Sequence, residues 1–146
     1  MENSINKYLQ LSTPEELHEE CHQWFSELEF IKDEQLFLDE LIKKYTIPLI
    51  SEKLYTTSLT LVGTLSKEEK SINDLQQECK DHCNHIEALL SHGCSAAEKK
   101  EYIVTHHYLK VAVFEYIEQY KNTKKALFDA IKSILKSENS KLLPKT

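Results

Sequence analysis

The sequence predicts an all-α protein, an elongated antiparallel bundle of three long helices. Only two Gly and three Pro interrupt the 146 residues, whereas helix-favouring Leu, Glu, Lys and Gln are abundant. Hydrophobic residues make up 40% of the chain, which is enough for one domain with a core. Apolar residues also recur at alternating spacings of three and four, the repeat that buries one side of a helix against partner helices.

The clearest repeat lies in the first predicted helix, residues 14–45. Thr13 is placed to cap its first turn, Pro14 suits the first helical position, and Glu16 completes a capping box. Thr46-Ile47-Pro48 predicts a tight reversal, since the residue before a proline avoids helical geometry. The buried face is expected to contain one polar residue, Gln35, among Leu17, Cys21, Trp24, Leu28, Ile31, Leu38, Ile42 and Tyr45.

The repeat continues through a second predicted helix, from Pro48 to about residue 92. Gly63, followed by Ser66 and Glu69, resembles a helix stop and a new capping box. The alternative fold is therefore a four-helix up-down bundle split near Gly63. The unbroken phase of the repeat favours one continuous helix, because a break usually resets the phase. The repeat comprises Ser51, Leu54, Ser58, Leu61, Leu65, Glu68, Ile72, Leu75, Cys79, His82, Ile86 and Leu89.

The second hairpin turn is predicted at Gly93-Cys94-Ser95. Gly93 suits the position after a helix end, and Ser95 can cap the next helix with Glu98 three residues on. The last helix is expected over residues 96–136, with Ile103, Leu109, Val113, Ile117, Tyr120, Leu127, Ile131 and Leu135 on one face.

A single bundle domain is predicted over residues 14–136. Residues 1–13 are expected to form an N-terminal arm, and residues 137–146 a flexible C-terminal tail.

Charge and composition limit the classes of function. The net charge of −6 argues against nucleic-acid binding, which normally needs a basic face. No apolar run approaches the roughly 20 residues that span a membrane, and no signal-peptide core follows Met1, so we expect a cytoplasmic protein. Its four cysteines are then expected to be reduced thiols. The absence of a phosphate-binding glycine loop, a nucleophile turn and an HExxH motif disfavours an enzyme.

Histidines supply the candidate functional residues. His82 and His106 lie on the apolar faces of their helices and are equally far from Cys94, so we expect the two rings to face one another. Such a pair can be purely structural and hydrogen-bonded. The alternative is a transition-metal site, because neutral imidazole and thiolate suit zinc, copper or iron. The ligands of that site would come from His82, His106, Cys79, His18 and Cys21.

The start of the first helix has two further histidines. His18 and His22 are four residues apart, the separation at which two imidazoles can bind one metal ion. The surrounding glutamates favour instead a solvated polar face. Counting back from the reversal at Thr46 puts His18 level with about residue 75, roughly 10 Å short of His82 at helical rise.

One segment resembles a family. The stretch His18-Glu19-Glu20-Cys21-His22-Gln23-Trp24, followed by Glu27-Leu28-Glu29-Phe30 and Lys32-Asp33-Glu34, is similar to a group of short helical proteins from flavobacteria and their relatives. A second histidine often stands in that group where this chain has Cys21. The resemblance covers the first helix. It implies a helical architecture and marks His18 and Cys21 as candidate functional positions. The group has no activity to carry over.

We therefore expect a non-enzymatic, cytoplasmic helical-bundle module that acts through packing, a protein partner or a homodimer. A small metal-binding bundle with ligands near the second hairpin is the alternative. A di-iron oxidoreductase is the third hypothesis, since Glu19-x-x-His22 matches half of the ferritin-like ligand repeat, but no second copy occurs. Hemerythrin-like bundles are an equally distant analogy, because residues 48–65 contain no histidine.

Overall fold

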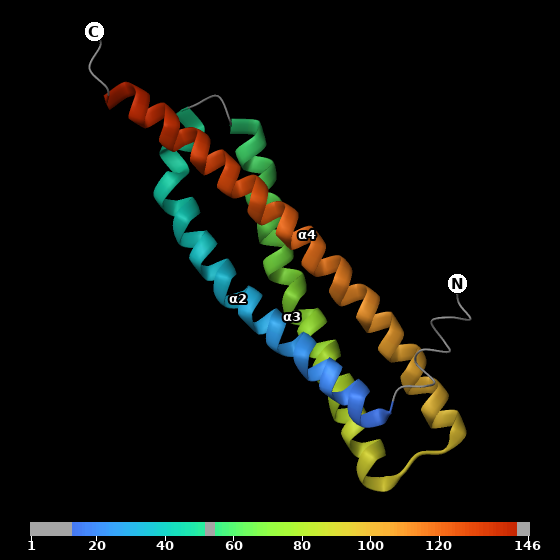
Figure 1. Ribbon diagram of the computed structural model, residues 1–146. Helices are drawn as coiled ribbons and strands as arrows, with labels where there is room; N and C mark the ends of the chain where they lie inside the picture. Colours follow the sequence, from blue (N-terminus) through green and yellow to red (C-terminus); the bar gives the residue numbers. More distant parts are fainter. Residues whose placement is uncertain (1–12, 52–54, 143–146) are drawn as a thin grey trace. The chain divides into compact units, whose positions relative to one another are not determined.

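A computed structural model describes residues 13–51 and 55–142, which form three long α-helices (Figure 1). Helix α2 spans Pro14–Ser51, α3 spans Tyr55–His92 and α4 spans Ala96–Leu142. The described residues contain no strand. The predicted all-α bundle of three helices is therefore confirmed. The expected arm, apart from Thr13, lies outside the described residues.

The predicted capping residues lie at the helix termini as expected. The backbone N–H of Glu16 donates to Thr13 Oγ1 at 3.2 Å, and that of Glu98 donates to Ser95 Oγ at 3.2 Å. Gly93 has a φ of 74°, in the left-handed region that glycine adopts after a helix end. The second hairpin therefore turns where the sequence predicts.

Two predicted helix ends are wrong. Helix α2 continues through Thr46-Ile47-Pro48 to Ser51. Pro48 removes one backbone donor from the helix, but it does not end the helix. Helix α4 continues to Leu142, through residues expected to be a tail. No Gly or Pro lies between 137 and 142, so no residue there breaks the helix before Pro144.

Helix α3 passes through Gly63 without a break. This confirms that the second helix is continuous and excludes the four-helix alternative. Its predicted start at Pro48 is wrong, because residues 48–51 belong to α2 and α3 begins at Tyr55. A Cβ atom built on Gly63 would meet no heavy atom within 4 Å. The glycine is therefore not required by packing.

The contacts group the chain into two compact units, and each helix contributes a segment to both. The first unit comprises the described residues up to Ile31 together with Ile72–Tyr116. Its hydrophobic core near the second hairpin comprises Leu17, Ile86, Leu89, Tyr102 and Ile103. None of the described helices is long and apolar enough to cross a membrane.

The second unit comprises Lys32–Ser71 and the chain from Ile117 onward. Its buried residues include Leu38, Leu65, Tyr120, Leu127, Ile131 and Ile134. Leu135, which the sequence places on the buried face, is 39% exposed, while Ile134 is fully buried. The spacing after Ile131 is thus three residues and not four. Polar contacts also join the helices, since the Tyr120 hydroxyl donates to Glu34 Oε1 at 2.7 Å and Thr123 Oγ1 donates to Glu68 Oε1 at 2.6 Å.

Candidate functional site

The buried histidine pair lies in the first unit, one residue from each of α3 and α4. His82 Nε2 and His106 Nδ1 are 3.0 Å apart, and the two side chains are 3% and 0% exposed. The predicted facing of the two rings is confirmed. Both residues occupy positions of the apolar repeat, and their side chains therefore lie in the core.

Glu20 of α2 completes a chain of three hydrogen-bonded side chains. Its Oε1 lies 3.0 Å from His106 Nε2 and 3.5 Å from Lys110 Nζ. An ionised carboxylate only accepts hydrogen bonds, so His106 donates from Nε2 and is left with an accepting Nδ1. His82 must then donate from Nε2 to His106. The chain therefore fixes one tautomer for each ring.

The surroundings keep both rings neutral. The Trp24 ring packs against the His106 ring with centroids 4.6 Å apart. Burial, together with the neighbouring His106, lowers the pKa of His82 to about 4. Burial also lowers the pKa of His106, although Glu20 acts in the opposite direction. Two neutral imidazoles joined by one hydrogen bond are therefore the stable form near neutral pH.

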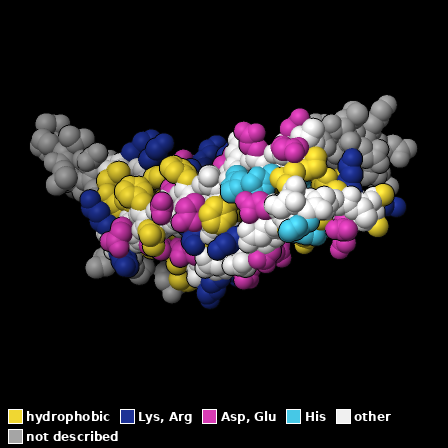
Figure 2. All heavy atoms as spheres, turned by 90° about the horizontal axis from the view of Figure 1, so that it is seen from below, with side chains coloured by type: hydrophobic (Ala, Val, Ile, Leu, Met, Phe, Trp, Pro, Cys, Tyr) yellow, Lys and Arg dark blue, Asp and Glu magenta, His cyan; other side chains and the backbone are white. Residues whose placement is uncertain are grey.

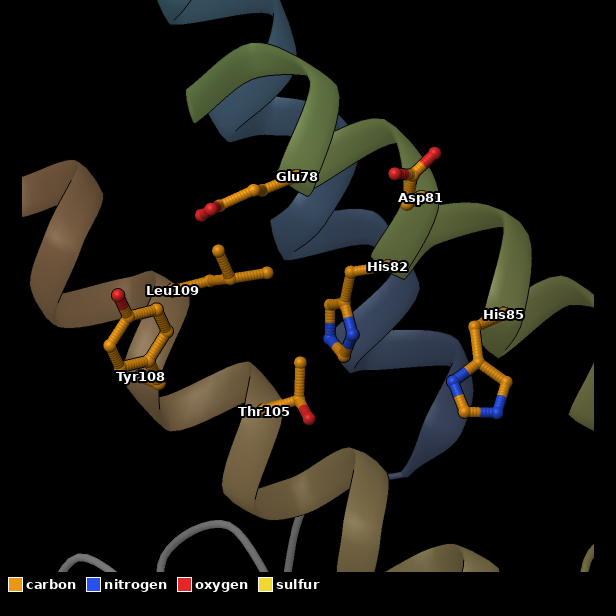
Figure 3. A pocket seen from close by; sticks show the side chains of 7 residues that line it. All are labelled: Glu78, Asp81, His82, His85, Thr105, Tyr108 and Leu109. Carbon is orange, nitrogen blue, oxygen red and sulfur yellow. The ribbon is translucent and has the colours of Figure 1, made fainter. Parts of the chain in front are cut away.

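The second ring nitrogen of His82 is unpaired within the described part of the chain. Its Nδ1 is buried and has no hydrogen-bond partner among the described residues. His82 also lines a cleft of about 300 Å³ between α3 and α4, together with Glu78, Asp81, His85, Thr105, Tyr108 and Leu109. Figure 3 shows the His82 ring and the Glu78 side chain extending from α3 toward α4. In the tautomer set by Glu20, this nitrogen can accept one hydrogen bond or bind a cation.

Three of the four cysteines are buried in the same unit as the pair. Cys21 Sγ donates to the carbonyl oxygen of Cys79 at 3.1 Å. Burial raises the pKa of Cys79 to about 12 and raises those of Cys21 and Cys83 as well. All four cysteines are free thiols, as the sequence predicts. The buried thiols are thus held in the protonated form near neutral pH.

His18 has different neighbours from those the sequence predicts. Its Nε2 lies 2.9 Å from Glu87 Oε1, and His22 Nε2 lies 3.9 Å from the same oxygen. His18 is therefore level with Glu87 and not with residue 75. The misplaced reversal at Thr46 caused this error, because α2 is longer than predicted. Figure 2 shows histidine side chains beside acidic ones at the surface.

The five predicted metal ligands are only partly brought together. His82 contacts His106, and Cys21 contacts Cys79. Within the described ranges, three candidate ligand atoms lie within 4.8 Å of one another only at His18, His22 and Glu87. The ligand set of His82, His106, Cys79, His18 and Cys21 stays a prediction. Sequence reasoning missed Glu20 and Glu87, which lie beside core residues but carry no motif of their own.

The outer side of α4 in the first unit is also apolar. Val104, Tyr108, Val111 and Phe114, called here the outer α4 stripe, are 62%, 65%, 42% and 64% exposed. Their spacings of four, three and three place them on one side of the helix. The opposite side carries the buried residues Tyr102, His106, Leu109, Val113 and Tyr116. This part of α4 is thus apolar on two opposite sides.

The chain matches no protein-family model, no curated protein and no solved structure. The resemblance of the first helix to the flavobacterial group stays an expectation. The functional proposals below are based on the contacts described above.

Proposed function

We propose that the protein is a non-enzymatic helical module that acts by pairing, and that the outer α4 stripe is its contact surface with a second copy of the chain. The observation that carries the proposal is the second apolar side of α4. A helix that is apolar on opposite sides is normally buried on both. Contiguous exposed apolar residues usually mark an interaction site.

The charges at the two ends of the stripe favour a second copy in antiparallel orientation. Lys100 precedes the stripe and Glu115 follows it, and both are exposed. Neither forms an ion pair with another residue in the part of the chain that the structure describes. If two α4 helices cross between His107 and Tyr108, Lys100 of each copy is level with Glu115 of the other. Two-fold symmetry then forms the same ion pair twice.

The same register also pairs apolar side chains. Val104 of one copy comes level with Val111 of the other. A parallel arrangement would instead bring Lys100 to Lys100 and Glu115 to Glu115, and like charges facing one another are unfavourable. The proposed dimer is therefore antiparallel along α4.

Analytical ultracentrifugation over a range of micromolar concentrations tests the proposal. The unchanged chain is expected to be a dimer, and Val111→Glu with Phe114→Glu is expected to be a monomer. Phe37→Glu is the matched control, since Phe37 is 58% exposed but lies in the second unit, and it should stay dimeric. A monomeric unchanged chain, or a dimer insensitive to the two α4 substitutions, would contradict the proposal.

Charge reversal tests the orientation. Lys100→Glu alone and Glu115→Lys alone should each weaken the dimer by about fivefold, since two exposed ion pairs are worth roughly 1 kcal/mol. The double variant Lys100→Glu, Glu115→Lys should restore the original affinity. Failure of the double variant to recover would exclude the antiparallel register.

A further inference from the structure

We infer that His18, His22 and Glu87 form a binding site for a divalent transition-metal ion, with zinc as the reference ion. The inference does not depend on the outer α4 stripe, which uses other residues. One ligand atom from each of His18, His22 and Glu87 lies within 4.8 Å of the other two. This cluster is the observation that carries the inference.

The separations fit the bond lengths of zinc. Ligand atoms about 2.0 to 2.2 Å from a tetrahedral zinc ion lie a little over 3 Å from one another. Glu87 Oε1 is 2.9 Å from His18 Nε2 and 3.9 Å from His22 Nε2, values on either side of that spacing. Small rotations of the side chains would therefore enclose an ion without any movement of the helices.

The backbone beneath the three ligands is fixed by the core. His18 follows Leu17, His22 follows Cys21, and Glu87 follows Ile86. Each of those preceding residues is at most 2% exposed. The two histidines are one turn apart on α2 and their rings are nearly perpendicular, at 82° with centroids 4.4 Å apart. The two Nε2 atoms therefore converge on one carboxylate oxygen.

The donor set determines the class of ion. Two imidazole nitrogens and one carboxylate oxygen suit zinc and its first-row neighbours, whereas calcium and magnesium prefer oxygen ligands alone. The side chains of His22 and Glu87 are 59% and 55% exposed, so the ion is reached from solvent. Three protein ligands leave one position for water or for a small anion.

Isothermal titration of the untagged protein with Zn²⁺, and with Mg²⁺ as the negative control, tests the site. We expect one zinc ion per chain and no magnesium binding. His22→Gln and Glu87→Gln should each weaken zinc binding by at least about tenfold, since loss of even an outer-shell partner costs that much. Both side chains are more than half exposed, so both variants should fold, which circular dichroism checks.

His85→Gln is the matched control, because His85 is an exposed histidine of the same unit on α3. It should bind zinc as the unchanged chain does. Zinc binding that survives His22→Gln but is lost in His82→Gln would move the ion to the buried pair and overturn the inference. Absence of zinc binding to the unchanged chain would overturn it too. A thiolate charge-transfer band on Co²⁺ substitution would contradict the assigned donor set.

Discussion

His82 shows how a single buried side chain makes folding depend on pH. Burial lowers its pKa in the folded protein to about 4, whereas an imidazole in the unfolded chain titrates near 6.5. Between these two values the unfolded chain takes up a proton that the folded chain does not. The free energy of unfolding should therefore decrease as the pH falls from about 6.5 to about 4. For His82 alone the loss is roughly 3 kcal/mol at most.

Urea unfolding at several pH values between 4 and 8 measures this dependence. His82→Ala should be less stable than the unchanged chain at pH 7, because His106 loses its donor. It should also lose less stability on acidification, since one titrating group is gone. His85→Gln, which changes an exposed ring on the same helix, should keep the full dependence. Equal pH slopes in all three proteins would contradict the assignment.

At the scale of one helix, the two glycines have contrasting roles, one inside α3 and one just after its end. Gly63 lies in the helix interior, with space for a Cβ atom, whereas Gly93 has a positive φ just after the helix end. Gly63→Ala should raise the free energy of unfolding by up to about 1 kcal/mol. Gly93→Ala should lower it, because alanine is strained at a φ of 74°.

Thermal and urea unfolding of the two variants, side by side, give the comparison. Both variants replace glycine with alanine, so the effect of that replacement on the unfolded chain is common to both. A difference in sign between their changes in the free energy of unfolding therefore reports the backbone conformation at each site. Destabilisation by Gly63→Ala would show that the helix is interrupted at that position.

The helix lengths also explain which part of the site could be predicted. His82 and His106 were found because both flank a turn that Gly93 and Ser95 define clearly. Glu20 and Glu87 were missed, since their partners depend on the length of α2. With α2 ending at Ser51, Trp24 comes level with His82 and His18 with Glu87. Pro48 suggested an earlier end to α2. A proline disfavours a helix without always ending it, and α2 continues past Pro48.

For the whole molecule, the repeat of apolar residues predicted the fold class and most of the core. It tolerates polar residues such as Gln35 and Glu68, which are buried as predicted. It could not predict which polar atoms meet, since these contacts depend on side-chain directions across helices. The outer α4 stripe was missed for another reason. Val104, Tyr108, Val111 and Phe114 follow a second repeat, and only the exposed fractions of both sets show which one faces outward.

The burial of the cysteines gives a prediction for the whole molecule. Cys94 is exposed, while Cys21, Cys79 and Cys83 are buried. A thiol reagent should therefore label one cysteine quickly in the folded protein and all four in denaturant, because the reagent attacks an accessible thiolate. Mass spectrometry counts the labels over time. Cys94→Ser should abolish the fast label, and fast labelling of more than one site would contradict the described core.

The packing of Trp24 on His106 has a consequence for experiment. Trp24 is the chain's one tryptophan, and its ring lies 4.6 Å from an imidazole that is hydrogen-bonded to both Glu20 and His82. A protonated imidazole quenches indole emission more strongly than a neutral one. The protein therefore carries a built-in fluorescent reporter for its buried histidines, which can be read without any added dye.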